Sequence, residues 1–109
     1  MPQRQVRALG LPDTGATRSI VSTRFLKTRN IPFQDKANVQ KLINASGQLM
    51  NSRGEIVLII IANGRLCTTN AIISNDCVHD IIIAWHDLVD LEITEESWCL
   101  EALFCWASP

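Results

Sequence analysis

Asn63-Gly64 lies between two runs of strand-forming residues, 56–62 and 66–73, and constrains the fold more than any other feature of the chain. Asn and Gly readily adopt the positive φ angles of a type I′ turn, so this dipeptide between two such runs is the strongest short signal of a β-hairpin. Further strand-like runs occur at 6–11, 39–43 and 81–84. Together these runs predict an all-β domain.

The length and apolar content of the chain are those of one small domain. Its 109 residues are 47% hydrophobic, which is enough for a single core, and no internal linker interrupts them. The longest uninterrupted apolar stretch, 56–62, is far shorter than the roughly 20 residues that span a bilayer, and the N-terminus lacks the apolar region of a signal peptide. We therefore expect an intracellular, cytoplasmic protein without a membrane partner.

The cysteines and histidines do not have the spacing of a metal site. Cys67, Cys77, Cys99 and Cys105 form no pairs two residues apart, and His79 and His86 are seven residues apart with no third ligand nearby. Structural zinc normally takes four ligands, and its ligands recur at short intervals. The sequence predicts no metal and no cofactor.

The charges are distributed unevenly along the chain. Residues 76–109 carry acids but no Lys or Arg, whereas residues 1–30 contain one acid, Asp13, against six basic residues: Arg4, Arg7, Arg18, Arg24, Lys27 and Arg29. A basic arm of this kind could contact nucleic acid, and such binding would weaken steeply with salt. The basic residues are not clustered and no aromatic residues interleave with them, so we expect a solvated face and no nucleic-acid partner.

A short apolar run, 9–11, leads into Pro12 and then Asp13, Thr14 and Gly15. Gly15 allows a close approach of the backbone, and Thr14 and Thr17 offer hydroxyl groups, so such a turn can hold a carboxylate in a buried place. The same residues are also compatible with an ordinary Asx-type turn between two strands.

Two downstream segments sharpen the interpretation of this loop. Asp80 is followed by the apolar residues 81–83, which run into Ala84 and then Trp-His-Asp-Leu. Residues 42–48 followed by 54–58 have the pattern of a hairpin with a polar tip. Over residues 6–94 the chain resembles the retropepsin-like aspartic proteases of gypsy-type retrotransposon polyproteins. The resemblance implies a small, closed, β-barrel-like acid protease fold with one or two short helices.

The resemblance also implies roles for particular residues. Asp13 would be the catalytic residue, and the loop around it would be supported by Thr14, Gly15, Ala16 and Thr17. The flap that closes over substrate would include Ala45, Ser46 and Gly47. The strand that packs against the loop would contribute Ile82, Ile83 and Ala84, and the family usually has Gly at the position of Ala84.

The chain contains one Asp-Thr-Gly and no Asp-Ser-Gly, so it offers a single loop of this kind. Aspartic proteolysis needs two carboxylates that share one proton. The resemblance therefore implies a homodimer in which Asp13 of each subunit activates a water and cleaves a peptide or polyprotein substrate without a cofactor. The alternative is a catalytically inert, retroelement-derived module that dimerises or binds peptides.

Two short helices and an additional tail are also predicted. Ser22 is a suitable cap for a helix over 23–28, and a second helix is expected over 86–91. Residues 1–94 would form the protease domain, without the additional N-terminal strand that the family generally has. The apolar tail, 95–109, has no assigned role; we expect a terminal helix or strand that covers the core.

Overall fold

The computed structural model describes residues 3–13, 15–34, 40–43, 49–93 and 100–107, and these are mostly β-strand. This part of the chain confirms the predicted all-β class with two short helices. The elements in chain order are β1 (Gln3–Asp13), β2 (Ile20–Ser22), α1 (Thr23–Thr28), β3 (Gln40–Ile43), β4 (Leu49–Ala62), β5 (Arg65–Ser74), β6 (Ile81–Ala84), α2 (Trp85–Asp90) and β7 (Leu100–Ala107).

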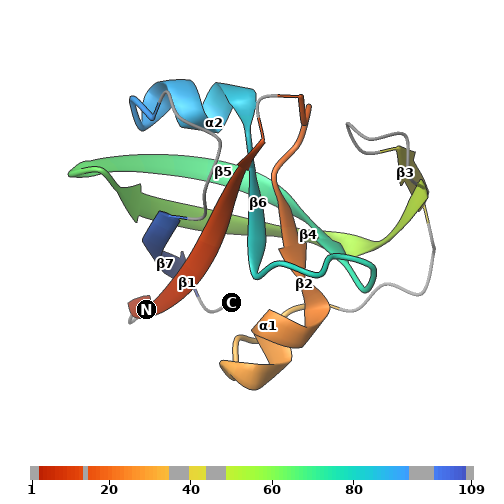
Figure 1. Ribbon diagram of the computed structural model, residues 1–109. Coiled ribbons are helices and arrows are strands. Elements are labelled where there is room, and N and C mark those ends of the chain that lie inside the picture. The colour runs from red at the N-terminus through yellow and green to blue at the C-terminus, as the bar shows by residue number, and fades with distance from the viewer. Residues whose placement is uncertain (1–2, 14, 35–39, 44–48, 94–99, 108–109) are drawn as a thin grey trace.

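The strands form one sheet in the order β3-β4-β5-β2-β6-β1-β7 (Figure 1). β7 pairs with β1 over eight residue pairs and also with β4, where only Ile59–Ile61 lie opposite Leu103–Cys105. The closed, barrel-like sheet predicted from the sequence is not what the structure shows. In the described part of the chain β3 ends the sheet and pairs with β4 alone, and β7 meets β4 over only three residue pairs. The first residues of β4, 49–52, pair with β3, and the rest of β4 pairs with β5. The pairing with β5 is irregular between Ser52 and Gly54, where Gly54 has a φ of 129°.

The hairpin predicted at Asn63-Gly64 is confirmed. β4 and β5 pair in antiparallel register up to Ala62 and Arg65, which leaves a two-residue turn. Asn63 and Gly64 have φ angles of 54° and 69°, as a type I′ turn requires. This turn sets the register of the longest strand pairing in the described part of the sheet.

The central strands are buried on both faces because their side chains alternate between two apolar clusters. The larger cluster contains Val21, Ile73, Ile81 and Ile83 together with buried apolar residues of both helices: Phe25, Leu26 and Leu88. The smaller cluster lies on the other side of these strands and consists of Ala16, Ile20, Ile72, Cys77, Ile82 and Ala84. The continuous apolar run of β6 is therefore explained by a strand that contributes to both clusters.

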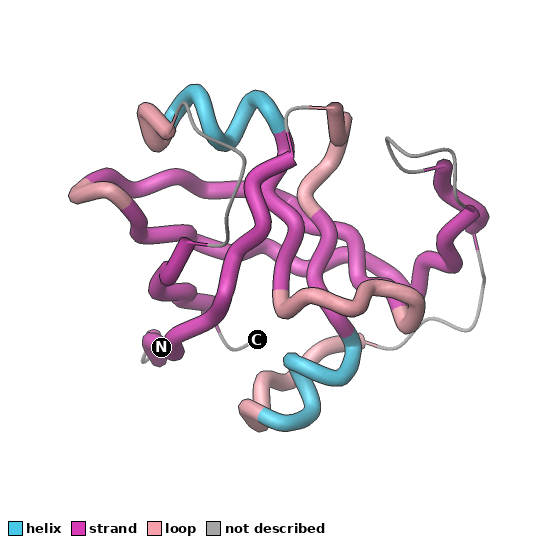
Figure 2. Tube along the Cα trace, in the orientation of Figure 1, coloured by secondary structure: helices cyan, strands magenta, loops and turns pink. Residues whose placement is uncertain are grey.

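The two helices lie at opposite ends of the central strands (Figure 2). α1 begins after Ser22, as predicted, and buries Phe25 and Leu26. Asn30 follows it with a φ of 56°. α2 spans Trp85–Asp90, one residue earlier than predicted at each end, and directly continues β6. In the described part of the chain no helix is long and apolar enough to cross a membrane.

The C-terminal segment is a strand of the main sheet. Of the two expected structures, a helix or a strand, the structure shows a strand over Leu100–Ala107. It runs antiparallel to β1 from Gln3↔Ala107 to Gly10↔Leu100. The tail, left without a role by the sequence analysis, therefore completes the sheet beside the strand that leads to Asp13.

Candidate active site

Asp13 lies at the end of β1, where three strands converge. β6 is inserted between β1 and β2, parallel to the first and antiparallel to the second. Within this arrangement Asp13 is the register partner of Ala84, the last residue of β6. The apolar strand 81–84 thus lies directly beside the Asp13 loop, which we define as residues 13–19.

The start of this loop is organised by Asp13 itself. The amide of Gly15 donates to Asp13 Oδ1 at 3.0 Å, and the amide of Ala16 donates to the Asp13 carbonyl at 3.1 Å. The first of these bonds is that of an Asx turn. It orients the half-buried carboxylate and leaves Oδ2 without a hydrogen bond to the loop among the described residues.

The rest of the loop is held by backbone amides from other elements. Trp85, the first residue of α2, donates its amide to the Ala16 carbonyl at 3.4 Å. The amide of Ala84 donates to Ser19 Oγ at 2.9 Å, and the amide of Ile72 donates to the Ser19 carbonyl at 2.9 Å. The junction of β6 and α2 therefore contacts the loop at two places.

Two small residues permit the close packing of β1 on β6. Ala84 has an extended backbone, with φ −73° and ψ 162°, and is fully buried, so its methyl group is accommodated beside the Asp13 loop. A Cβ on Gly10 would lie 2.8 Å from Ile83 Cδ1. A larger residue at position 10 would displace the Ile83 side chain, which is completely buried in the larger cluster.

The structure brings some of the predicted site residues together and separates others. Ala16, Ile82 and Ala84 belong to the smaller cluster beside the loop, and Leu11 packs against it. Ile83 lies in the larger cluster on the other face of β6. Gly15 and Thr17 are exposed. Thr14 and the predicted flap residues Ala45, Ser46 and Gly47 lie outside the described residues.

A buried polar cluster behind the loop was missed from the sequence. It consists of Ser19, Asp87 and Cys67, which are 1%, 2% and 4% exposed. Ser19 Oγ donates to Asp87 Oδ2 at 2.5 Å, and the Cys67 thiol donates to Asp87 Oδ1 at 3.3 Å. The available signal was an acid three residues after the buried strand, in the first turn of a helix, where it would ordinarily be assigned to the helix dipole.

The Cys67 thiol is kept protonated by this environment. Burial, followed by its hydrogen bond to Asp87 and the negative charges of Asp87 and Asp90, raises the pKa of Cys67 to about 12. Ligand atoms of these three residues lie within 4.8 Å of one another. The protonated thiol donates to the Asp87 carboxylate, and it could bind a metal only after losing its proton, because a thiol binds metals as the thiolate.

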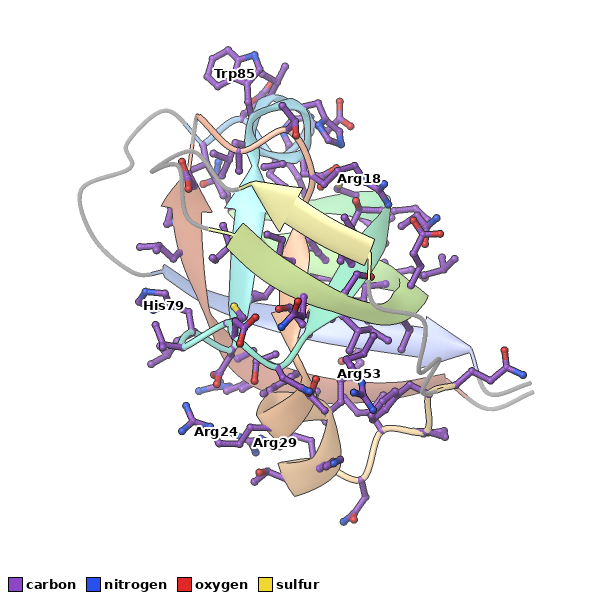
Figure 3. All side chains as sticks on the ribbon, turned by 90° about the vertical axis from the view of Figure 1, so that its right-hand side faces the viewer. Arg18, Arg24, Arg29, Arg53, His79 and Trp85 are labelled. Atoms are coloured by element: carbon purple, nitrogen blue, oxygen red, sulfur yellow. The ribbon has the colours of Figure 1, made fainter. Side chains whose placement is uncertain are left out.

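One wall of the loop is polar and exposed to solvent. The guanidinium of Arg18 lies 2.8 Å from Glu55 Oε1 and donates to the Asn70 carbonyl at 2.8 Å (Figure 3). Asn70 in turn donates to Glu55 Oε2 at 3.3 Å. These contacts join the Asp13 loop to β4 and β5.

Comparisons with protein-family models, with curated proteins and with solved structures found no match to this chain.

Proposed function

We propose that this chain is an aspartic endopeptidase of retropepsin type that acts as a homodimer and has the acid protease fold. The observation that carries the proposal is the position of Asp13. It ends β1 after the apolar run 9–11, lies opposite Ala84 between converging strands, and accepts a hydrogen bond from Gly15 at 3.0 Å. A carboxylate oriented in this way at the edge of a buried cluster suits a general base.

The second carboxylate would come from Asp13 of another copy. Two carboxylates about 3 Å apart cannot both ionise, so one would remove a proton from a bridging water while the other stays protonated. The protonated partner would donate a hydrogen bond to the scissile carbonyl and stabilise the charge that develops on its oxygen. No metal or cofactor takes part in these steps.

The substrate would be an extended segment of a polyprotein with apolar side chains at the cleavage site. The β3–β4 hairpin would supply the flap, and substrate main chain would add to it as a strand. Flap closure would exclude water from the reaction.

The experiment is cleavage of a mixed peptide library between mildly acid and neutral pH, with sedimentation to report the dimer. Asp13→Asn keeps an oxygen that can accept from Gly15 but removes the ionisable group, so cleavage should be lost. Glu92→Gln is the matched control, because it removes an acid that pairs with Arg65 at 2.8 Å on the surface and should leave cleavage unchanged.

Each result decides between the enzyme and an inert module. Cleavage that depends on Asp13 supports the enzyme, whereas a confirmed dimer that cleaves nothing supports a module that dimerises or binds peptides. If the chain is a monomer, two copies joined by a flexible linker supply the second Asp13 at high effective concentration. Failure of this linked pair to cleave would also contradict the proposal.

A further inference from the structure

Asp87 is a buried carboxylate that the proposed mechanism does not use. It is 2% exposed and lies in the first turn of α2. A buried charge is costly unless hydrogen bonds compensate it, so the hydrogen-bond partners of Asp87 indicate which groups it orients. Those partners are Ser19 Oγ at 2.5 Å and the Cys67 thiol at 3.3 Å, while the exposed ring of His86 has Nε2 3.5 Å from Asp87 Oδ1.

The direction of the hydrogen bonds in this cluster is determined by chemistry. The amide of Ala84 can only donate, so Ser19 Oγ accepts from it at 2.9 Å. The hydroxyl hydrogen of Ser19 is then directed to Asp87 Oδ2. The result is a series of hydrogen bonds from amide to hydroxyl to carboxylate, in which each bond polarises the next.

This series of hydrogen bonds joins the two sides of the candidate active site. Ser19 is the last residue of the Asp13 loop, and Ala84 is the register partner of Asp13. The neighbouring amide, that of Trp85, holds the middle of the same loop through Ala16. Loss of the Ser19 hydroxyl would leave the Ala84 amide unpaired where β6 supports Asp13, and the end of the loop would keep only the bond from the Ile72 amide to the Ser19 carbonyl.

We infer that Asp87 and Ser19 are positioning residues, which hold the Asp13 carboxylate in the geometry needed for proton transfer. The inference rests on the proposed protease function for its catalytic part. Asp87 acts on Ser19, Ser19 acts on the loop and on Ala84, and neither residue contacts substrate. A displacement of about 1 Å at a reacting group can cost on the order of 100-fold in rate.

The test compares Ser19→Ala with Ser19→Thr and with Ser22→Ala. Ser22 is also buried, at 2% exposed, and its hydroxyl accepts a hydrogen bond from the Phe25 amide. It caps α1, at the end of the central strands opposite to α2 (Figure 2). We expect Ser19→Ala to lower kcat by about 10- to 100-fold with KM changed less than about 3-fold. Ser19→Thr, which keeps the hydroxyl, should restore most of kcat, and Ser22→Ala should leave kcat unchanged.

A second variant and a second measurement keep the inference testable apart from catalysis. Asp87→Asn retains an oxygen that can accept from Ser19, so it should fold and show a smaller fall in kcat than Ser19→Ala. The NMR shift of the Gly15 amide proton reports its bond to Asp13 Oδ1, and it should change in Ser19→Ala but not in Ser22→Ala.

The outcomes separate the two proposals. If neither the wild-type dimer nor the linked pair cleaves, the protease function fails, and the Gly15 shift still shows whether Ser19 positions Asp13. An unchanged Gly15 shift in Ser19→Ala would overturn the inference. In an active enzyme it would also be overturned if Ser19→Ala and Ser22→Ala lower kcat equally, because the role of Ser19 would then be structural only.

Discussion

The two helices of this protein both follow a buried strand, but their first turns are capped in different ways. Each has six residues and continues a short, fully buried strand, β2 for α1 and β6 for α2. Ser22 caps α1 with its own side chain, which accepts from the Phe25 amide at 2.9 Å. Ala84 precedes α2 and has no side chain that can cap it.

The missing local cap of α2 is replaced by contacts with the Asp13 loop. The amides of Ala84 and Trp85 donate to Ser19 Oγ and to the Ala16 carbonyl. Helices of this length are not stable alone, so each needs partners for its unpaired amides. α1 obtains its partner from the adjacent residue, whereas α2 obtains its partners from a segment more than 60 residues away, which couples its position to the candidate active site.

The other ends of the helices differ as well. α1 has Lys27 in its last turn, and the guanidinium of Arg29 lies 5.8 Å from the centre of the Phe25 ring. α2 has no basic residue in its last turn and exposes Trp85, which extends away from the molecule at the start of the helix (Figure 3). α2 is therefore the helix whose stability depends more on tertiary contacts.

The largest effect on stability is expected from Asp87→Ala. The change leaves the buried Ser19 hydroxyl and Cys67 thiol without their acceptor, and we expect the free energy of unfolding to fall by about 3 kcal/mol. Urea denaturation measures the loss. Asp90→Ala, an exposed position on the same helix, is the control and should change stability by less than about 0.5 kcal/mol. Equal losses at the two positions would contradict a tertiary role for Asp87.

A smaller loss is expected from Ser22→Ala. Removal of the cap leaves the Phe25 amide without its partner, which typically lowers stability by about 1 kcal/mol. Thr28→Ala, at the exposed end of α1, is the control in the same denaturation experiment. A loss as large as that of Asp87→Ala would show that the two helix starts are energetically alike, which would break the comparison.

The Cys67 thiol predicts a specific dependence of stability on alkaline pH. Its pKa is raised from 9.0 to about 12 in the folded protein, so above pH 9 the unfolded chain loses this proton and the folded protein keeps it. The unfolded state is then favoured progressively, and the stability contributed at lower pH is lost between about pH 9 and 12.

Cys67→Ser tests this dependence, because the hydroxyl can still donate to Asp87 but does not ionise in this range. The wild-type protein should lose more stability than the variant between pH 8 and 10, as measured by urea denaturation. Parallel curves would show that Cys67 is not the group responsible. Cys77, whose pKa is also raised by burial, is present in both proteins and cancels in the comparison.

The smallest effect concerns the helix ends. Asp90 is an acid in the last turn of α2, where the negative end of the helix dipole disfavours it, so Asp90→Asn should stabilise the protein by about 0.5 kcal/mol. Lys27→Gln in the last turn of α1 should have the opposite sign and a similar size. Shifts of the same sign in thermal unfolding would contradict the dipole explanation.

Local signals predicted those elements whose partners are close in sequence. Ser22 predicted the start of α1 because the cap and the capped amide are three residues apart. Asn63-Gly64 predicted the hairpin because its turn geometry depends on those two residues. The closed barrel was wrong, since the path of β4 before Gly54, where it pairs with β3, depends on pairing that the sequence pattern does not encode.

The sequence by itself determined the all-β class, the hairpin, α1 and the placement of Asp13 after an apolar strand, because each depends on residues within one turn or one strand. Only the tertiary structure decided that β6 lies between β1 and β2, that residues 100–107 pair with β1, and that Ser19, Cys67 and Asp87 meet. Cys67 is 20 positions from Asp87 in the sequence, and Ser19 is 68 positions from it. Burial makes these distant polar groups depend on one another for their hydrogen bonds.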